Sequence, residues 1–286
     1  MPHFQRGLSP LLRGYLQNVQ FRSKLLFMGD RNRETQGIIF SLKKQGEQNR
    51  LVSILTPDQG IINCMLYGGP KSKLRSLVQP FNRGSLYLYT DNIKHSVKIT
   101  DFDAKKIHMS LRENLYKSWA ATLASEILLK TKCAGDPQNS FILLSALLDG
   151  IDAVSEEEAR LGMLRFLWRY LGLLGIQPDA RECTSCGTSL LSKEHDIYYI
   201  ENQNGFVCSD CIPYSAENLR KAAENFKLDI HSITYLAAIN ELTPGKVREL
   251  ILPAESAYKL KRLLYHLIEK SCGTKLETLE SGAGIL

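Results

Sequence analysis

Long apolar runs are absent from this chain of 286 residues. The longest, such as Leu171–Ile176, are far shorter than the ~20 residues that a helix needs to cross a membrane. Residues 1–27 have no acidic side chain and no apolar core of signal-peptide length. Because 44% of the residues are hydrophobic and 23% are charged, the composition is that of a globular protein without membrane segments.

Recognisable catalytic motifs are absent as well. A nucleic-acid ligase needs a lysine nucleophile in a Lys-x-Asp-Gly motif, and the chain has none. The phosphate-binding pattern Gly-x-x-x-x-Gly-Lys-Ser/Thr is also missing, and neither paired carboxylates nor a Ser/His/Asp arrangement stands out. These absences disfavour an enzyme, so we expect a protein that binds other molecules.

Acidic residues are scarce in the N-terminal part. Net charge is +5 over residues 1–33, +5 over 34–109 and −4 over 110–286. A chain with this asymmetry often binds a polyanion through one half and proteins through the other, although solvated surface charge alone gives the same pattern. We interpret residues 1–33 as a leader that is disordered or, because Met28 offers a later start, partly untranslated; an organelle transit peptide is the alternative.

Seven cysteines are present, and four of them form two tight pairs. Two Cys-x-x-Cys turns at this separation can bring four thiolates together as a tetrahedral site, which suits one structural Zn²⁺. A redox-active pair and a contribution from the intervening His195 are the alternatives. Gly187 and Gly205 flank the pairs and let backbone amides approach sulfur. The ligands predicted from this spacing are Cys183, Cys186, Cys208 and Cys211.

Short apolar segments separated by turn residues predict five strands between residues 34 and 109. The spacing suits a small barrel, with an OB-type barrel as the leading form. The predicted strands are Gln36–Lys43, Arg50–Thr56, Ile61–Tyr67, Ser85–Tyr89 and His95–Thr100.

Helical periodicity follows from residue 110 onward. Leu111 to Ile127 recur at helical spacing, and further helices are predicted to begin near Asp136, Ser155, Ser215, Asp229 and Pro253. Trp119 and Trp168 are predicted core residues. The fold class is therefore α+β: an N-terminal barrel over 34–109 and a helical bundle over 110–286, with a zinc ribbon inserted at 183–211.

A basic, acid-free segment lies between the predicted third and fourth strands. No acid occurs between Asp58 and Asp91. Glycines and a proline are expected to hold this segment as a loop from which cations reach phosphates without reading sequence. Tyrosines in the next strand face outward if the leucines between them fill the core, and there they either stack on bases or are covered by a neighbouring element. The candidate residues are Lys71, Lys73, Arg75, Arg83, Tyr87 and Tyr89.

These residues resemble RecO, the bacterial family of recombination and DNA-repair mediators. The resemblance covers about residues 34–280, and the order of its motifs is its specific feature. The leader has no counterpart in the family, and the basic segment has fewer arginines than is typical. The matching segments are Gly46–Arg50, Leu55–Gly60, Lys71–Leu74, Leu77–Asn82, Leu171–Pro178 and the two cysteine pairs.

The resemblance implies a cytoplasmic, nucleoid-associated protein that is not an enzyme. It implies binding of single- and double-stranded DNA, annealing of complementary strands, and loading of RecA onto DNA coated by single-stranded-DNA-binding protein (SSB), with RecR as a partner. Arg165 and Arg169 lie four residues apart and are candidates to hold the acidic SSB tail, unless they pair with acids such as Glu126. A zinc-ribbon adaptor of transcription or translation is the alternative function.

Overall fold

The structure, a computed structural model, describes residues 31–69, 71–93, 95–192, 196–212 and 224–282. The expected leader up to residue 30, His195 and the helix start expected at Ser215 lie outside these residues. The chain forms two compact units. The first unit contains the residues up to Phe166 together with those from Ile268 onward, and the second unit contains Leu167–Leu267. In the part of the chain that is described, no helix combines the length and apolarity needed to cross a membrane.

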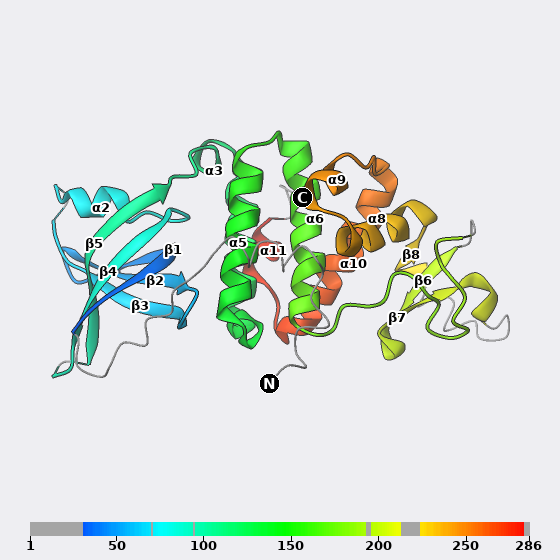
Figure 1. Cartoon of the computed structure of the whole chain (residues 1–286), viewed down its shortest axis with the longest axis horizontal. Helices are drawn as coiled ribbons and strands as arrows, with labels where there is room; N and C mark the ends of the chain where they lie inside the picture. The colour runs from blue at the N-terminus through cyan, green and yellow to red at the C-terminus, as the bar shows by residue number, and fades with distance from the viewer. Residues whose placement is uncertain (1–30, 70, 94, 193–195, 213–223, 283–286) are drawn as a thin grey trace. The chain divides into compact units, whose positions relative to one another are not determined.

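Five strands of the first unit form a closed barrel in the order β1-β2-β3-β5-β4 (Figure 1). Neighbours run antiparallel except β3 and β5, which are parallel and meet at the residue pair Met65 and Lys98. This topology confirms the predicted OB-type barrel. The strands are β1 (Asn32–Gln45), β2 (Asn49–Thr56), β3 (Gly60–Leu66), β4 (Arg83–Asp91) and β5 (Ser96–Lys106).

Three strands are several residues longer than the sequence predicted: β4 spans Arg83–Asp91 in place of Ser85–Tyr89, and β1 and β5 extend further. β1 begins at Asn32, which pairs with Tyr89, and Arg33 pairs with Leu88. The last two residues of the expected leader therefore belong to the barrel. β5 continues to Lys106 and does not end near residue 100. The extension of β1 is held by pairing with the distant β4, and that of β5 by pairing with β4 in the same hairpin. The local alternation of apolar residues reveals neither.

The barrel interior is filled by side chains that alternate along the strands. Ile39, Val52 and Leu86 are fully buried in this core. At the irregularity where β4 starts, the backbones of β4 and β5 approach closely, and a Cβ on Gly84 would lie 2.0 Å from the carbonyl oxygen of Asp103. Only glycine fits there, so this residue allows the strands to bend and the barrel to close.

A short helix, α2 (Lys73–Leu77), connects β3 to β4. Leu74 and Leu77 pack against the barrel core and hold the helix in place. The chain then returns to β1, where the amide of Phe81 donates to the carbonyl of Ile39 at 2.7 Å. These contacts fix the entry into β4, which is the strand with the candidate tyrosines.

The first unit also contains helices. Asn114, Asp136 and Ser155 cap α4, α5 and α6, because each side chain accepts a backbone N–H of the first turn. The predicted helix through Leu111 is interrupted at Asn114, whose extended backbone ends α3 and starts α4. The elements are α3 (Ser110–Glu113), α4 (Leu115–Lys130), η2 (Lys132–Gly135), α5 (Pro137–Asp152), the start of α6 (Glu156–Leu173) and α11 (Glu277–Ser281).

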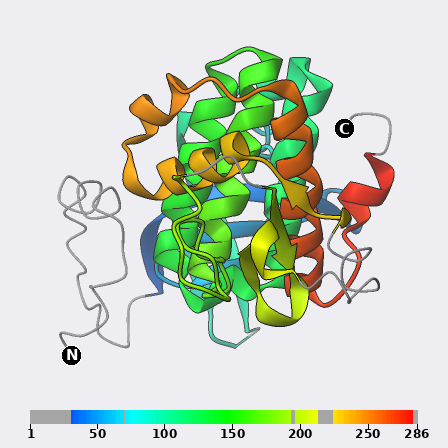
Figure 2. The same ribbon diagram turned by 90° about the vertical axis from the view of Figure 1, so that its right-hand side faces the viewer.

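The second unit contains a small sheet in the order β7-β6-β8, with helices beside it (Figure 2). The predicted ribbon strands at Tyr198 and Phe206 are confirmed as β6 and β7. Trp168 is fully buried and lies 6.4 Å from Phe206, ring centre to ring centre. The elements are β6 (Ile197–Ile200), η3 (Glu201–Gln203), β7 (Gly205–Cys208), η4 (Ser209–Cys211), β8 (Lys227–Leu228), α8 (Ile230–Glu241), α9 (Pro244–Arg248) and α10 (Ala254–Cys272) up to Leu267.

Candidate nucleic-acid interface and metal centre

The basic segment has a different local structure from the expected loop. Lys71 lies before the helix, whereas Lys73 and Arg75 belong to α2. Positions two apart in a helix point in different directions, so Lys73 and Arg75 flank the partly buried Leu74 and do not share a face. Lys71 and Lys73 are exposed and Arg75 is half-buried. The segment therefore presents its cations on two sides of a helix that is anchored on the barrel.

Arg83 is engaged within the protein. Its guanidinium donates to Asp149 of α5 at 2.9 Å, and His108 contacts the other carboxylate oxygen at 2.9 Å. Burial raises the pKa of Asp149, but the hydrogen bond from His108 and the charge of Arg83 outweigh it and lower that pKa below its usual value. The second ring nitrogen of His108 lies 2.7 Å from the carbonyl oxygen of Phe81. This cluster joins β4 to α5, and a DNA contact by Arg83 stays a prediction.

The two tyrosines of β4 lie on the outer face of the barrel, as predicted. Leu86 and Leu88 are buried, whereas the side chain of Tyr87 is 37% exposed. Their surroundings differ in charge. Glu34 on β1 lies beside Tyr87, and its negative charge raises the pKa of that phenol. Lys98 on β5 places its ammonium 4.6 Å from the ring centre of Tyr89.

Sequence reasoning missed two cations at Tyr89. Lys98 lies beside its ring, and Arg31 donates to its hydroxyl at 3.4 Å. Strand alternation around the buried Ile99 gives a signal for an outward Lys98. No comparable signal marks Arg31, because its position depends on the register between β1 and β4.

The four predicted sulfur ligands converge in the second unit. The Sγ atoms of Cys183, Cys186, Cys208 and Cys211 all lie within 4.8 Å of one another and form a group that can hold a metal ion. Three of the sulfur–sulfur separations are 3.9, 3.9 and 3.6 Å, which is too long for disulfides of ~2.05 Å. A tetrahedral ion with metal–sulfur bonds of ~2.3 Å requires separations of ~3.8 Å. The donor set therefore fits a tetrahedral thiophilic ion.

Two tight turns present these sulfurs. Gly187 adopts φ +71°, and its amide donates to the carbonyl of Cys183 at 2.8 Å. The backbone amide of Cys208 donates to the sulfur of Cys183 at 3.4 Å. Gly205 permits a close approach of the two turns, since a Cβ there would lie 2.0 Å from the hydroxyl of Thr184. The amide that approaches sulfur is thus that of Cys208, whereas Gly187 serves by its backbone conformation and Gly205 by its lack of a side chain.

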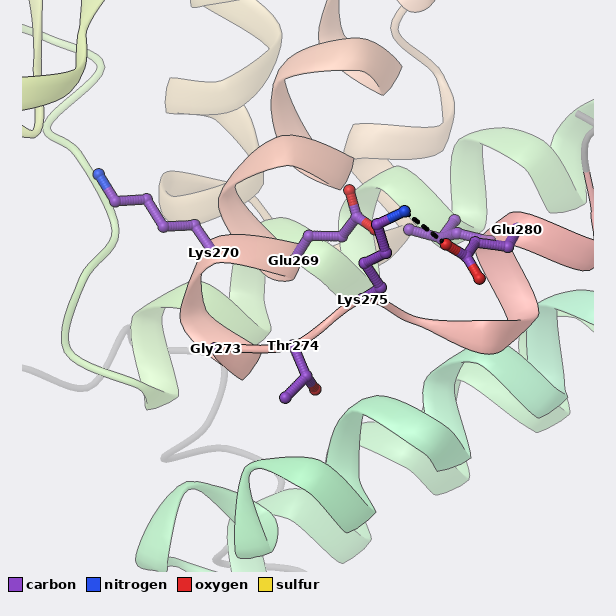
Figure 3. A pocket seen from close by; sticks show the side chains of 7 residues that line it. Glu269, Lys270, Gly273, Thr274, Lys275 and Glu280 are labelled. Carbon is purple, nitrogen blue, oxygen red and sulfur yellow. Dashed lines mark ion pairs between the residues drawn. The ribbon is translucent and has the colours of Figure 1, made fainter.

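A shallow pocket lies at the end of α10 in the first unit. Lys275 and Glu280 pair across it at 3.0 Å, while Lys270 points away (Figure 3). The pocket contains neither the predicted DNA-binding residues nor the sulfur ligands.

Comparison with known proteins identifies the family through both halves of the chain. The model of "Recombination protein O N terminal" matches residues 30–107, and that of "Recombination protein O C terminal" matches residues 112–280. The chain belongs to the RecO family.

Curated RecO relatives are similar along most of the chain. A DNA repair protein RecO from Lactobacillus acidophilus is 30% identical over 187 residues, which cover 62% of this chain and 70% of the relative. One from Desulforamulus reducens is 25% identical over 246 residues, with 85% and 91% covered. One from a Synechococcus species is 27% identical over 247 residues, with 82% and 78% covered. The resemblance to RecO drawn from the sequence motifs is confirmed.

The residues suggested to hold a partner of this RecO-family chain make internal contacts. Arg165 is buried and donates to Glu158, which lies about two turns earlier, near the N-terminus of α6. Arg169 donates to the carbonyl of Ile239 at 3.4 Å. Glu126, the acid expected as an alternative pair, instead accepts the amides of residues 277 and 278 at 2.9 Å. A role for Arg165 and Arg169 in partner binding stays a prediction.

Proposed function

We propose that this protein is a DNA-repair and recombination mediator without a chemical step of its own. It binds single- and double-stranded DNA without sequence preference and anneals complementary strands. It also helps to load RecA onto SSB-coated DNA, together with RecR. Family membership gives the repair context, and the barrel with its basic segment supports direct contact with DNA.

The observation that carries the proposal is the closed barrel with an acid-free stretch between Asp58 and Asp91. Lys71, Lys73 and Arg75 project from the part of this stretch that is anchored on the core. This stretch contains no acidic side chain that would repel the phosphate oxygens of DNA. Such contacts bind any sequence, and they weaken with rising salt because salt cations compete with the protein for the phosphates.

Strand annealing without a nucleotide cofactor is the first test. We expect the purified full chain to accelerate annealing of complementary oligonucleotides and to bind both single strands and duplexes. A protein that binds neither form of DNA would contradict the mediator and favour the zinc-ribbon adaptor of transcription or translation.

Replacement of Lys71, Lys73 and Arg75 together by alanine tests the contact surface. We expect weaker binding to all sequences, and a log–log salt dependence that is shallower by roughly 0.7 to 0.9 for each lost contact. Titrations at several salt concentrations measure this slope. The matched control replaces Lys246, Arg248 and Lys261 in the other unit, which removes the same charge. Equal slopes for the two triple variants would place the contacts elsewhere.

We further propose that the four cysteines hold one structural Zn²⁺. Four thiolate ligands leave no coordination position for a substrate, so the ion would stabilise the ribbon and take no part in chemistry. The sulfur separations and the amide that donates to Cys183 support this assignment.

The partner surface is the third element of the proposal. The helical region has net charge −4, yet the acidic SSB tail requires cations around an apolar contact. Arg169 is the better candidate of the two predicted arginines, because Arg165 is buried and paired with Glu158. RecR binding rests on family membership alone.

A further inference from the structure

The outer face of the barrel contains a row of side chains that crosses four strands. Met65 of β3 pairs with Lys98 of β5, Lys98 pairs with Tyr89 of β4, and Tyr89 pairs with Asn32 of β1. Directly paired residues point to the same side of a sheet, so these side chains are neighbours. The row contains one aromatic ring and one cation, and none of its members is acidic.

Two cations lie against this aromatic ring. The Lys98 ammonium is 4.6 Å from the ring centre of Tyr89, and Arg31 donates to the Tyr89 hydroxyl at 3.4 Å. Lys98 and Arg31 are exposed, and Tyr89 is half-buried. A flat ring between two exposed cations offers one surface for a base and two positive charges for the phosphates on either side of it.

The adjacent row has the opposite character. Tyr87 pairs with Glu34 on one side and with Asp101 on the other. Both acids are exposed, and the charge of Glu34 is the main cause of the raised pKa of Tyr87. A nucleotide at Tyr87 would bring its phosphates next to two carboxylates. Two tyrosines that appear equivalent in sequence therefore differ in their suitability for a polyanion.

Asp91 is the next acid along β4 after Tyr89. Its carboxylate accepts the amide of Ile93 at 3.0 Å and closes the turn between β4 and β5. The acids of this face thus lie on both sides of the Tyr89 row along the strand, with the positive region between them.

We propose that Tyr89, with Lys98 and Arg31, forms a stacking subsite for one unpaired base of single-stranded DNA, and that Tyr87 lies outside it. This inference rests on the proposed DNA-binding function and specifies which part of the barrel distinguishes single strands. An unpaired base stacks on the Tyr89 ring, and Lys98 turns to a neighbouring phosphate. The exchange is favourable because base–aromatic stacking is stronger than a cation–π contact at an exposed site.

Duplex DNA does not use this subsite. Its bases are stacked on one another and paired, so no base face is available to the ring. The cations of the basic segment, in contrast, contact phosphates of either form. Selectivity for single strands then arises at Tyr89, and general affinity arises at the basic segment.

The test compares Tyr89→Ala with Tyr87→Ala, which removes an outward tyrosine of the same strand. Fluorescence anisotropy of the full chain is measured with oligo(dT) and with a mixed-sequence duplex of equal length. We expect Tyr89→Ala to weaken oligo(dT) binding about tenfold, which corresponds to the loss of one stacked base. Duplex binding should change less than about twofold. Tyr87→Ala and Tyr89→Phe should both retain single-strand binding.

Photocrosslinking supplies a readout that does not depend on a variant. A single strand that contains 5-bromodeoxyuridine is irradiated with the wild-type protein, and fragment-ion mass spectrometry locates the adduct. An adduct on Tyr89 and not on Tyr87 supports the subsite. Equal loss of single-strand and duplex binding in Tyr89→Ala, an equal effect of Tyr87→Ala, or an adduct on Tyr87 would overturn it. Wild-type protein that binds no DNA would instead overturn the proposed function itself.

Discussion

Asp149 connects three segments through a single carboxylate. Arg83 of β4 and His108, which follows β5, each contact one of its oxygens at 2.9 Å. The two ring nitrogens of His108 lie against the Asp149 carboxylate and the Phe81 carbonyl oxygen. The side chain of His108 is 2% exposed, and water therefore does not replace a lost partner.

Replacing Asp149 by asparagine should lower the free energy of unfolding. Charged hydrogen bonds contribute about 1.5–3 kcal/mol each, and partial exposure of Asp149 reduces the expected loss to about 1–2 kcal/mol in total. Urea unfolding at neutral pH measures it. Glu255→Gln is the control, because Glu255 is 79% exposed and its ion pair with Lys259 should contribute little.

The same carboxylate should make stability depend on pH in the acid range. The pKa of Asp149 is lower in the folded protein than its ordinary value. Its contribution is therefore fully present above the unfolded pKa of about 3.9 and is lost as the pH falls through the folded pKa. The stability difference between wild type and Asp149→Asn should shrink below about pH 4. A difference that stays constant down to pH 2 would contradict this role.

At the scale of single residues, the sequence predicted which way a side chain points better than it predicted which residues lie next to that side chain. Alternation with Leu86 and Leu88 placed Tyr87 and Tyr89 outward, because neighbouring side chains of a strand point to opposite faces. Whether Glu34 or Arg31 lies next to each ring depends on strand register, which no local pattern determines. The contact of Arg83 with Asp149 was not predicted for the same reason, since Asp149 is 66 residues away in sequence.

Among the elements, the cysteine ribbon depends most on a few side chains. β6 and β7 are four residues long each, and β8 has two. Strands this short form a marginal sheet by themselves. Under the zinc proposal, an ion held by the four converging sulfurs would supply the missing stability.

Metal removal should therefore unfold this element selectively. We expect about one zinc per chain by elemental analysis, as the four-sulfur site predicts. Cys208→Ser should lose the metal and the protection of the β6 and β7 amides against hydrogen exchange, while the barrel amides stay protected. Cys272→Ser is the control, since this cysteine lies outside the cluster. Metal-free protein with an intact, protected ribbon would rule out a structural ion.

The sequence predicted some elements of the structure better than others. Cap residues located the starts of α5 and α6, because Asp136 and Ser155 accept backbone amides that would otherwise lack partners. The sulfur site followed from spacing alone. The basic segment was predicted as a loop because its glycines and proline mark a turn, yet Leu74 and Leu77 gain enough from burial to hold one helical turn there.

For the whole molecule, the uneven distribution of charge distinguishes the two proposed modes of binding. The barrel region 34–109 has net charge +5, and region 110–286 has −4. In the proposed function, long-range attraction would bring a polyanion to the first region, whereas an acidic protein tail would need individual cations in the second. Binding of the tail should therefore be weaker, local and dependent on apolar contacts.

A peptide that copies the acidic SSB tail should bind the full chain, and loss of its terminal apolar residue should abolish binding. Arg169→Ala should weaken the interaction, whereas Arg165→Ala should mainly lower stability by leaving Glu158 unpaired. Calorimetric titration measures the affinity, and thermal unfolding separates the two effects. The Lys71, Lys73 and Arg75 variant is the control. Loss of peptide binding there would place the tail on the barrel.

The parallel junction between β3 and β5 has a consequence for folding. The strands β1, β2 and β3 follow one another along the chain, so their hairpins form from local contacts. The pairings of β1 with β4 and of β3 with β5 require distant segments to meet, and such closures are the slow part of barrel formation. The row from Met65 to Asn32 spans both closures. A nascent or partly folded chain consequently lacks this surface, and any single strand that occupies it stabilises the closed barrel by mass action.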